Sequence, residues 1–216
     1  MAVKNLVLFL LNCLRVNLIK NFYIITLQKS DMEDEQVMDA LEAILTRRSV
    51  RKYTEKEIDD TCIQQLIEAA VSAPSAGNQQ PWHFIIIDDR RILDKIPEFH
   101  PHAKMLKEAQ KAILVCGDIN LEKYKGYWML DCSAATQNIL LAARALGLGA
   151  CWLGVYPREE RIIKLRELLG IPENVIPFSL ISLGYPAEKQ EKIRREYKSR
   201  IHYNNPNRNL FCILSI

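Results

Sequence analysis

Four short apolar runs alternate with helix-like segments from residue 34 onward, and this order limits the possible folds more than any other feature of the chain. The runs are residues 84–87, 112–116, 150–155 and 177–183. The first two are unbroken, which is typical of strands buried on both faces, and Asp88-Asp89 after the first indicates a turn. The order of elements therefore predicts a mixed α and β domain in which helices cover a sheet.

Four segments have helical periodicity, two before the first of these runs and two between later ones. In the first, Val37, Leu41, Ile44 and Leu45 fall on one face after an acidic cluster that suits an N-terminus. The second follows the cap candidates Asp59, Asp60 and Thr61 and must end near Pro74. Its predicted buried stripe is Ile63, Leu66, Ile67, Ala70 and Val71. Residues 127–146 form the longest periodic segment, which predicts a central helix, and residues 158–169 form the last, which Gly170 and Pro172 stop.

The composition of the chain excludes several classes of protein. With 216 residues, of which 49% are hydrophobic and 25% charged, the chain can form one sizeable core. Its 29 Lys and Arg against 26 Asp and Glu leave a net charge of +3, too even a balance for a nucleic-acid-binding protein. The six cysteines form no CxxC pair and have no metal-ligand spacing with histidine, so they indicate a reduced, cytoplasmic setting without a disulfide framework or metal site.

Both ends of the chain differ from the region between them. Residues 6–11 are apolar, but polar residues such as Asn12 and Arg15 follow, and the run is shorter than the ~20 residues that span a bilayer. Residues 1–31 are therefore interpreted as an extension of unknown role, which disfavours a membrane protein although a weak membrane association stays open. The main domain is predicted over residues 32–205, and residues 206–216 are a tail without an assigned role.

One short segment, residues 47–51, has the composition of a phosphate clamp. Arg47, Arg48 and Arg51 carry guanidinium groups, each a planar fork of donors that matches phosphate oxygens two at a time, and Ser49 adds a hydroxyl donor. The alternative is a solvated basic helix end, because the helix macrodipole also favours cations at a C-terminus.

A second polar segment, residues 72–82, lies between the second helix and the first strand. It is rich in Ser, Ala, Gly and Pro, so its backbone can approach a flat ligand closely. Asn78 and Gln80 can donate to and accept from ring heteroatoms. An ordinary helix-to-strand loop has the same composition and stays open as the alternative.

Four strings of residues together resemble one known family. They are Arg47-Arg48-Ser49-Val50-Arg51, residues 74–82 (PSAGNQQPW), residues 146–154 (LGLGACWLG), and Gly184-Tyr185-Pro186 followed by Arg194-Arg195. In this order they resemble the nitroreductase family of FMN flavoproteins, over residues 34–205. The resemblance implies an α+β fold, with a mostly antiparallel central sheet covered by helices, in an intertwined homodimer that shares its flavin site.

The resemblance also implies roles for individual residues. Arg47, Arg48, Ser49 and Arg51 match the family's phosphate and ribityl contacts, and Arg194 or Arg195 matches the basic residue that closes over the phosphate. Asn78 matches the amide that bonds the flavin ring, and Ser75 matches a residue from the partner subunit. Leu153 and Gly154 match positions whose backbone amides lie near flavin N5 and O4, with Trp152 beside them.

The implied activity is that of an FMN-dependent oxidoreductase that takes hydride from NAD(P)H. It would reduce a nitroaromatic, a quinone or a related electrophile in alternating half-reactions, and no side chain need act as a catalytic nucleophile. The sequence contains no convincing Ser-His-Asp or Cys-His set. Two alternatives stay open: a reductive dehalogenase of the same family, which the short stretch 118–127 disfavours, and a non-enzymatic flavin-binding protein.

Overall fold

The structure is a computed structural model that describes residues 38–189 and 195–204. The predicted N-terminal extension, the predicted C-terminal tail and Arg194 lie outside the described residues. The boundaries of the predicted domain at residues 32 and 205 lie outside them as well.

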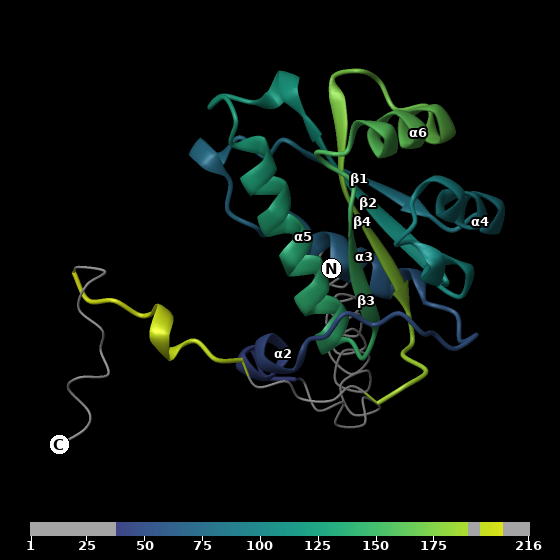
Figure 1. Cartoon of the computed structure of the whole chain (residues 1–216), viewed down its shortest axis with the longest axis horizontal. Coiled ribbons are helices and arrows are strands. Elements are labelled where there is room, and N and C mark those ends of the chain that lie inside the picture. Colours follow the sequence, from purple (N-terminus) through teal and green to yellow (C-terminus); the bar gives the residue numbers. More distant parts are fainter. Residues whose placement is uncertain (1–37, 190–194, 205–216) are drawn as a thin grey trace, which may run out of the picture. The chain divides into compact units, whose positions relative to one another are not determined.

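A four-stranded antiparallel sheet forms the centre of the described region (Figure 1). Its strands are β1 (Trp82–Ile87), β2 (Lys111–Asp118), β3 (Gly149–Gly154) and β4 (Val175–Gly184), in the order β1-β2-β4-β3. Each neighbouring pair of these strands is antiparallel. The predicted sheet is thus confirmed, and β1 and β3 are its two edges.

Five α-helices surround this sheet in the described residues. They are α2 (Ala40–Thr46), α3 (Asp60–Val71), α4 (Arg90–Phe99), α5 (Trp128–Ala145) and α6 (Glu159–Leu169). Four of them match the predicted helical segments. Asp59 caps α3 as predicted, because its carboxylate accepts a hydrogen bond from Thr61 N–H at 2.8 Å. Gly170 ends α6 in a left-handed conformation with φ of 66°.

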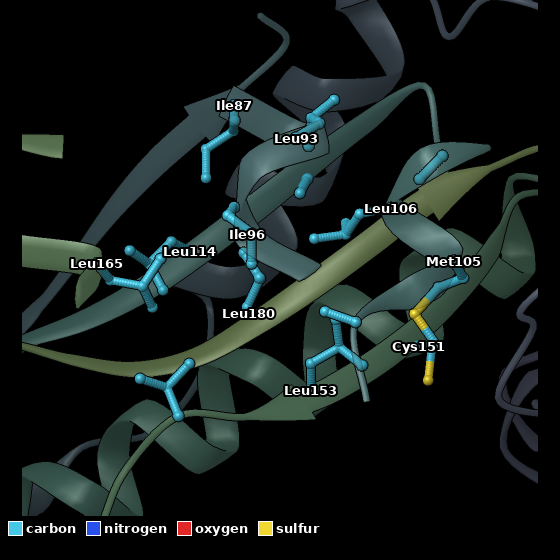
Figure 2. Close-up of a cluster of buried hydrophobic side chains, with 14 of the residues drawn as sticks. Ile87, Leu93, Ile96, Met105, Leu106, Leu114, Cys151, Leu153, Leu165 and Leu180 are labelled. Atoms are coloured by element: carbon cyan, nitrogen blue, oxygen red, sulfur yellow. The ribbon is translucent and has the colours of Figure 1, made fainter. Parts of the chain in front are cut away.

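Two hydrophobic clusters lie on opposite faces of the sheet. Residues of α4 and α6 pack on one face, and residues of α3 and α5 pack on the other. Figure 2 shows the first cluster, in which Leu93 and Ile96 of α4 and Leu165 of α6 surround Leu114 and Leu180 of the sheet. Successive residues of a strand point to opposite faces, so Ile113 of β2 joins the second cluster while Leu114 joins the first. Strand β2 is therefore buried on both faces, as its apolar run predicted.

The prediction that residues 84–87 are buried on both faces is wrong. Among the strands of the described region, β1 pairs only with β2. Phe84 and Ile85 are half-buried, and Ile86 is exposed. An edge strand of an antiparallel sheet needs only one covered face, and its apolar residues do not reveal this. Val71 was also expected in the buried stripe of α3, but it lies at the last position of the helix and is exposed.

Helix α4 was not predicted from the sequence. It is ten residues long, five of its residues are charged, and it contains Pro97. Only Leu93 and Ile96 are buried, so the apolar stripe is too short to give a periodic signal. His100 follows directly as the C-terminal cap, and the next turn, η2 (Lys104–Lys107), leads the chain toward β2.

The apolar face of α2 is not buried by the described part of the chain. Leu41, Ile44 and Leu45 are 65%, 52% and 59% exposed, and Ala43 is the buried residue of this helix. Val37 of the predicted stripe lies outside the described residues, and the other three members belong to neither hydrophobic cluster.

Candidate functional site

The basic segment 47–51 runs along the beginning of β3. Val50 N–H donates to Ala150 C=O at 3.0 Å, and Ser49 pairs with Ala150 in a parallel bridge. The segment can approach this closely because position 149 is glycine: a Cβ there would lie 2.7 Å from Val50 Cγ1. Tyr53 fixes the far end of the segment, since its buried hydroxyl bonds to Val50 C=O and Ser182 Oγ, both at 2.7 Å.

The outer edge of β3 presents backbone groups beyond this contact. In an antiparallel pair, alternate residues bond to the neighbouring strand and the others point away from it. Ala150 C=O points away from β4, toward Val50, so the register gives Trp152 and Gly154 the same outward orientation. Leu153, between these two residues, directs its backbone amide toward β4. Its side chain lies in the first hydrophobic cluster.

A cleft of about 550 Å³ opens at this edge. Four of the predicted site residues line it: Arg51, Trp152, Leu153 and Gly154. The other lining residues are Cys151 of β3, Arg161 of α6, and His100, Pro101, His102, Lys104 and Met105 between α4 and β2. This lining contains three permanent cations and two histidines without a carboxylate, so the cleft suits an anionic ligand with a flat apolar part.

The positive charges near β3 act on one another. Burial lowers the pKa of Arg47, and the charges of Arg195 and then Arg48 lower it further. The charge of Arg195, far away in the sequence, is therefore close enough to act on Arg47. An anion placed among these groups would relieve their mutual repulsion, and the guanidinium is the side chain best suited to hold a phosphate.

Arg48 and Ser49 have different surroundings. The guanidinium of Arg48 donates through Nη1 to Arg47 C=O at 2.6 Å and to Leu45 C=O at 3.2 Å. These bonds satisfy carbonyls at the end of α2, as the alternative of a basic helix end predicted. Ser49 is exposed beside β3.

A second cleft, of about 510 Å³, lies at the start of α3 and has the opposite charge. Its lining includes Glu57, Asp59, Asp60 and Asp88, and the one cation there, Lys111, pairs with Asp60. These carboxylates would repel a phosphate, so the cleft at β3 is the better candidate for a nucleotide-like ligand.

The loop with Ser75 and Asn78 is held in an uncommon backbone conformation. Gly77, Asn78 and Gln80 have φ of 52°, 55° and 48°, in the left-handed region. Ser75 Oγ accepts from Gln80 N–H at 3.1 Å, and Asn78 Oδ1 accepts from the side-chain amide of Gln80 at 2.9 Å. Asn78 is exposed and Ser75 half-buried, so both can face a neighbouring molecule.

Two buried residues that were not predicted hold this loop in place. Asp131 of α5 accepts from Ala76 N–H at 2.9 Å and from Gln79 Nε2 at 2.6 Å. Gln79 Oε1 accepts in turn from Lys123 N–H at 2.8 Å and Tyr124 N–H at 3.1 Å. Because α5 contains other polar residues as well, the sequence offers no distinct signal for Asp131, although its burial requires partners.

The structure does not bring the loop and the basic segment together within one chain. The loop contacts Asp131 near the start of α5, whereas Arg144 near the end of α5 donates to Thr46 Oγ1, beside the basic segment, at 2.9 Å. Thirteen helical residues separate these two contacts, or about 20 Å at 1.5 Å per residue. Arg51 and the edge of β3 thus form one part of the predicted site, and Ser75 and Asn78 form a separate part.

The sequence patterns assigned no role to His100, His102, Lys104 or Arg161. These residues reach the cleft through α4, which was not predicted, and through the start of α6. In residues 38–189 and 195–204, no cluster of His, Cys, Asp or Glu could hold a metal ion. No helix in these same ranges is both long and apolar enough to cross a membrane.

Comparison with known proteins shows the family of the chain. The model of the nitroreductase family matches residues 44–126 and 98–185. A Methanothermobacter thermautotrophicus protein named "Putative NADH dehydrogenase/NAD(P)H nitroreductase" is 57% identical over 151 residues, which cover 70% of this chain and 79% of that protein. The "FMN reductase [NAD(P)H]" of Bacillus subtilis is 28% identical over 172 residues, covering 71% and 68%.

A solved structure agrees with this result. The FMN-dependent nitroreductase of Clostridium difficile R20291 superposes with a TM-score of 0.71 at 30% identity, covering 76% of this chain and 99% of that one. The family model, these relatives and the antiparallel sheet with its four matching motifs lead to one conclusion: the chain belongs to the nitroreductase family.

Proposed function

We propose that this protein is an FMN-dependent oxidoreductase that takes hydride from NADH or NADPH and reduces a nitroaromatic, a quinone or a related electrophile. The observation that carries this proposal is the cleft at β3, where a set of cations without a carboxylate meets outward-facing backbone groups. An FMN molecule combines a dianionic phosphate with a flat ring that accepts hydrogen bonds, and the cleft suits both parts.

The phosphate would be held by the basic residues beside the start of β3. Arg47 and Arg51 supply guanidinium donors from the basic segment, and the exposed Ser49 supplies a hydroxyl. Arg195, whose charge acts on Arg47, would close over the phosphate, with Arg194 as the adjacent candidate. Arg48 would support the clamp by holding the end of α2, because its guanidinium bonds to backbone carbonyls there.

The ring would lie along the open edge of β3. The outward amides of Trp152 and Gly154 are the donors that the strand offers to ring heteroatoms, and Leu153 would contribute its side chain at the base of the cleft. Asn78 would bond the ring from a second subunit, and Ser75 would accompany it. Lys104 and Arg161 add positive charge, which favours the extra negative charge of a reduced ring.

When bound, FMN supplies the redox chemistry by accepting hydride at N5 and returning electrons to the acceptor. The side chains bind and orient the reactants and keep the cleft electropositive. Because FMN would supply the redox chemistry, no side chain needs to act as a nucleophile. The protonation of the thiols in the sheet agrees with this. Burial raises the pKa of Cys116 to about 12 and also raises the pKa of Cys151, so both stay protonated and poorly nucleophilic at neutral pH.

The active form would be a homodimer with two shared flavin sites. The two parts of the predicted site lie at opposite ends of α5 in one chain, so a second copy is needed to complete each site. The exposed apolar face of α2, next to the basic segment, offers a surface for such a partner. This functional unit would comprise residues 32–205 and act in the cytoplasm, without nucleic acid or a membrane as partner.

The proposal is tested by the purified protein's colour and its response to nicotinamides. We expect yellow protein that releases FMN on heating, and we expect anaerobic NADH or NADPH to bleach the flavin absorbance. Air or a nitroaromatic acceptor should then restore that absorbance. A protein that binds no flavin would refute the proposed cofactor, and bound flavin that no nicotinamide reduces would indicate a non-enzymatic flavin protein.

A further inference from the structure

Two side chains from different helices converge on one backbone carbonyl in the cleft. His100 Nε2 donates to Gly154 C=O across 3.0 Å, and Arg161 Nη1 donates to the same oxygen across 2.6 Å. His100 is the C-terminal cap of α4, while Arg161 lies in the first turn of α6. The end of β3 is thus tied to both helices on this face of the sheet.

Gly154 needs such anchors because little else restrains it. It is the last residue of an edge strand, it is exposed, and a Cβ at this position would meet no atom within 4 Å. Glycine has the largest conformational freedom to lose on folding. Leu153 before it is fixed in the ladder with β4, and Val155 after it donates to Phe178 C=O at 3.2 Å. The two donors on its carbonyl fix the remaining freedom of Gly154.

The buried position of His100 is energetically unfavourable for a histidine. Its side chain is fully buried, and because a carbonyl only accepts, Nε2 must carry the hydrogen. Nδ1 is then a buried acceptor, and no described residue donates to it. A buried polar atom without a partner is destabilising, so packing alone would favour an apolar residue here. Burial and then the charge of Arg161 lower the pKa of His100, which keeps the imidazole neutral at pH 7.

We propose that His100 and Arg161 are positioning residues, which hold the carbonyl of Gly154 and so restrain the backbone of this residue, so that its outward N–H stays aligned with the reacting part of the flavin. This inference rests on the proposed function for the identity of the ligand. Neither side chain exchanges a proton or an electron. Their effect is to keep the amide in place before the ligand arrives, and a displacement of about 1 Å in such a group can cost on the order of a hundredfold in rate.

The experiment compares variants that remove the donors with variants that keep them. His100→Leu removes one donor and leaves the charge of the cleft unchanged, because the imidazole is neutral. His100→Gln retains an N–H donor in a side chain of similar polarity. Arg161→Met removes the other donor, and Arg161→Lys keeps a donor and the charge. Lys164→Met is the matched control, since Lys164 is an exposed cation on the same helix that pairs with Glu167 at 3.0 Å.

Two measurements separate positioning from a general effect on the fold. In the flavin-free protein, we expect faster hydrogen exchange at the amide of Val155 in His100→Leu and Arg161→Met than in the wild type. This N–H belongs to the same peptide unit as Gly154 C=O and is bonded to Phe178 C=O. In the flavin-loaded protein, we expect anaerobic reduction by NADH to be about ten- to a hundredfold slower. The dissociation constant for FMN should change less than about threefold, because the phosphate clamp is intact. His100→Gln and Arg161→Lys should recover most of both effects, and Lys164→Met should match the wild type.

Several results would overturn this assignment. If exchange at the Val155 amide and flavin reduction are both unchanged in folded His100→Leu and Arg161→Met, these residues do not position Gly154. Faster exchange with unchanged reduction would also reject the role in flavin chemistry. Should His100→Leu fail to fold, hydrogen exchange in Arg161→Met still tests the restraint, because this measurement is made without flavin and does not depend on how the Arg161 charge affects the reduced ring. A wild-type protein that binds no FMN would refute the proposed function, while the exchange measurement would still decide whether the two donors restrain Gly154.

Discussion

Arg51 is the predicted phosphate contact that lines the cleft beside β3. Its Nη1 lies 3.5 Å from Ser49 C=O, at the limit of a hydrogen bond, so the guanidinium can turn to a stronger acceptor. Arg51→Ala should therefore weaken FMN binding by about 1.5–3 kcal/mol, the contribution of a hydrogen bond to a charged group. Titration of the flavin-free protein with FMN, followed by the quenching of flavin fluorescence, measures this loss. Lys95→Ala, at an exposed cation of α4 outside the cleft, should bind like the wild type.

His100 makes the stability of the protein depend on pH. Its pKa is lowered from 6.5 in the folded state, mainly by burial and next by Arg161, while the hydrogen bond to Gly154 C=O opposes the shift. As pH falls below about 6.5, the unfolded chain binds a proton before the folded one does, so the free energy of unfolding should decrease. Above that pH the imidazole is neutral in both states and contributes no pH dependence.

Urea unfolding between pH 5 and pH 8, in steps of about half a pH unit, tests this expectation. His100→Gln lacks the titrating group, so its stability should fall less steeply in the acid range than that of the wild type. Parallel curves for the two proteins would show that His100 is protonated equally well in both states.

The basic segment and β3 depend on each other through Gly149. A methyl group at this position would lie 2.7 Å from Val50 Cγ1 and 2.8 Å from Val50 Cβ, and the β-branched valine cannot turn aside. Gly149→Ala should therefore push residues 47–51 away from the strand and weaken FMN binding at least tenfold. The double variant Gly149→Ala with Val50→Gly removes every side-chain atom in the collision and should recover most of the affinity in the same titration. If it does not, the defect lies elsewhere in β3.

The helices and strands differ in how well the sequence alone could predict them. Strand β2 was predictable because apolar residues cover both of its faces, and helix α5 was predictable because its apolar residues recur with helical spacing over a long segment. Helix α4 was missed because only Leu93 and Ile96 are buried and Pro97 interrupts the pattern. The exposure of Ile86 depends on strand order, and a local pattern contains no information about which strands pair.

The residues of the candidate site also differ in how well the sequence alone could predict them. Composition identified Arg47 and Arg51, because a cluster of guanidinium groups is unusual and has a clear chemical use. The roles of His100, Arg161 and Asp131 arise from contacts between residues at least seven positions apart in the chain. A lone histidine or a single buried carboxylate gives no such signal until the fold places a carbonyl or an amide beside it. The outward orientation of Gly154 likewise follows only from the register with β4.

At the scale of the whole molecule, the proposed dimer would form through the exposed apolar face of α2, so loss of this contact would also affect FMN binding. Ile44 is 52% exposed on this helix, and Ile163 on α6 is 50% exposed, so the two residues are matched in type and exposure. Lysine in place of Ile44 would introduce a charge into the proposed contact between subunits, where it would lack a partner. The same change at Ile163 leaves the charge in water.

Ile44→Lys should therefore give a folded monomer that has also lost tight FMN binding, because in the proposed dimer each flavin site takes Asn78 and Ser75 from a second subunit. Ile163→Lys should remain a dimer with FMN bound. Light scattering measures the mass of each variant, and the flavin titration measures its affinity on the same sample. If Ile44→Lys is monomeric yet binds FMN as tightly as the wild type, the site is complete within one chain. If it stays dimeric, α2 lies outside the contact between subunits, and the partner must approach through another surface.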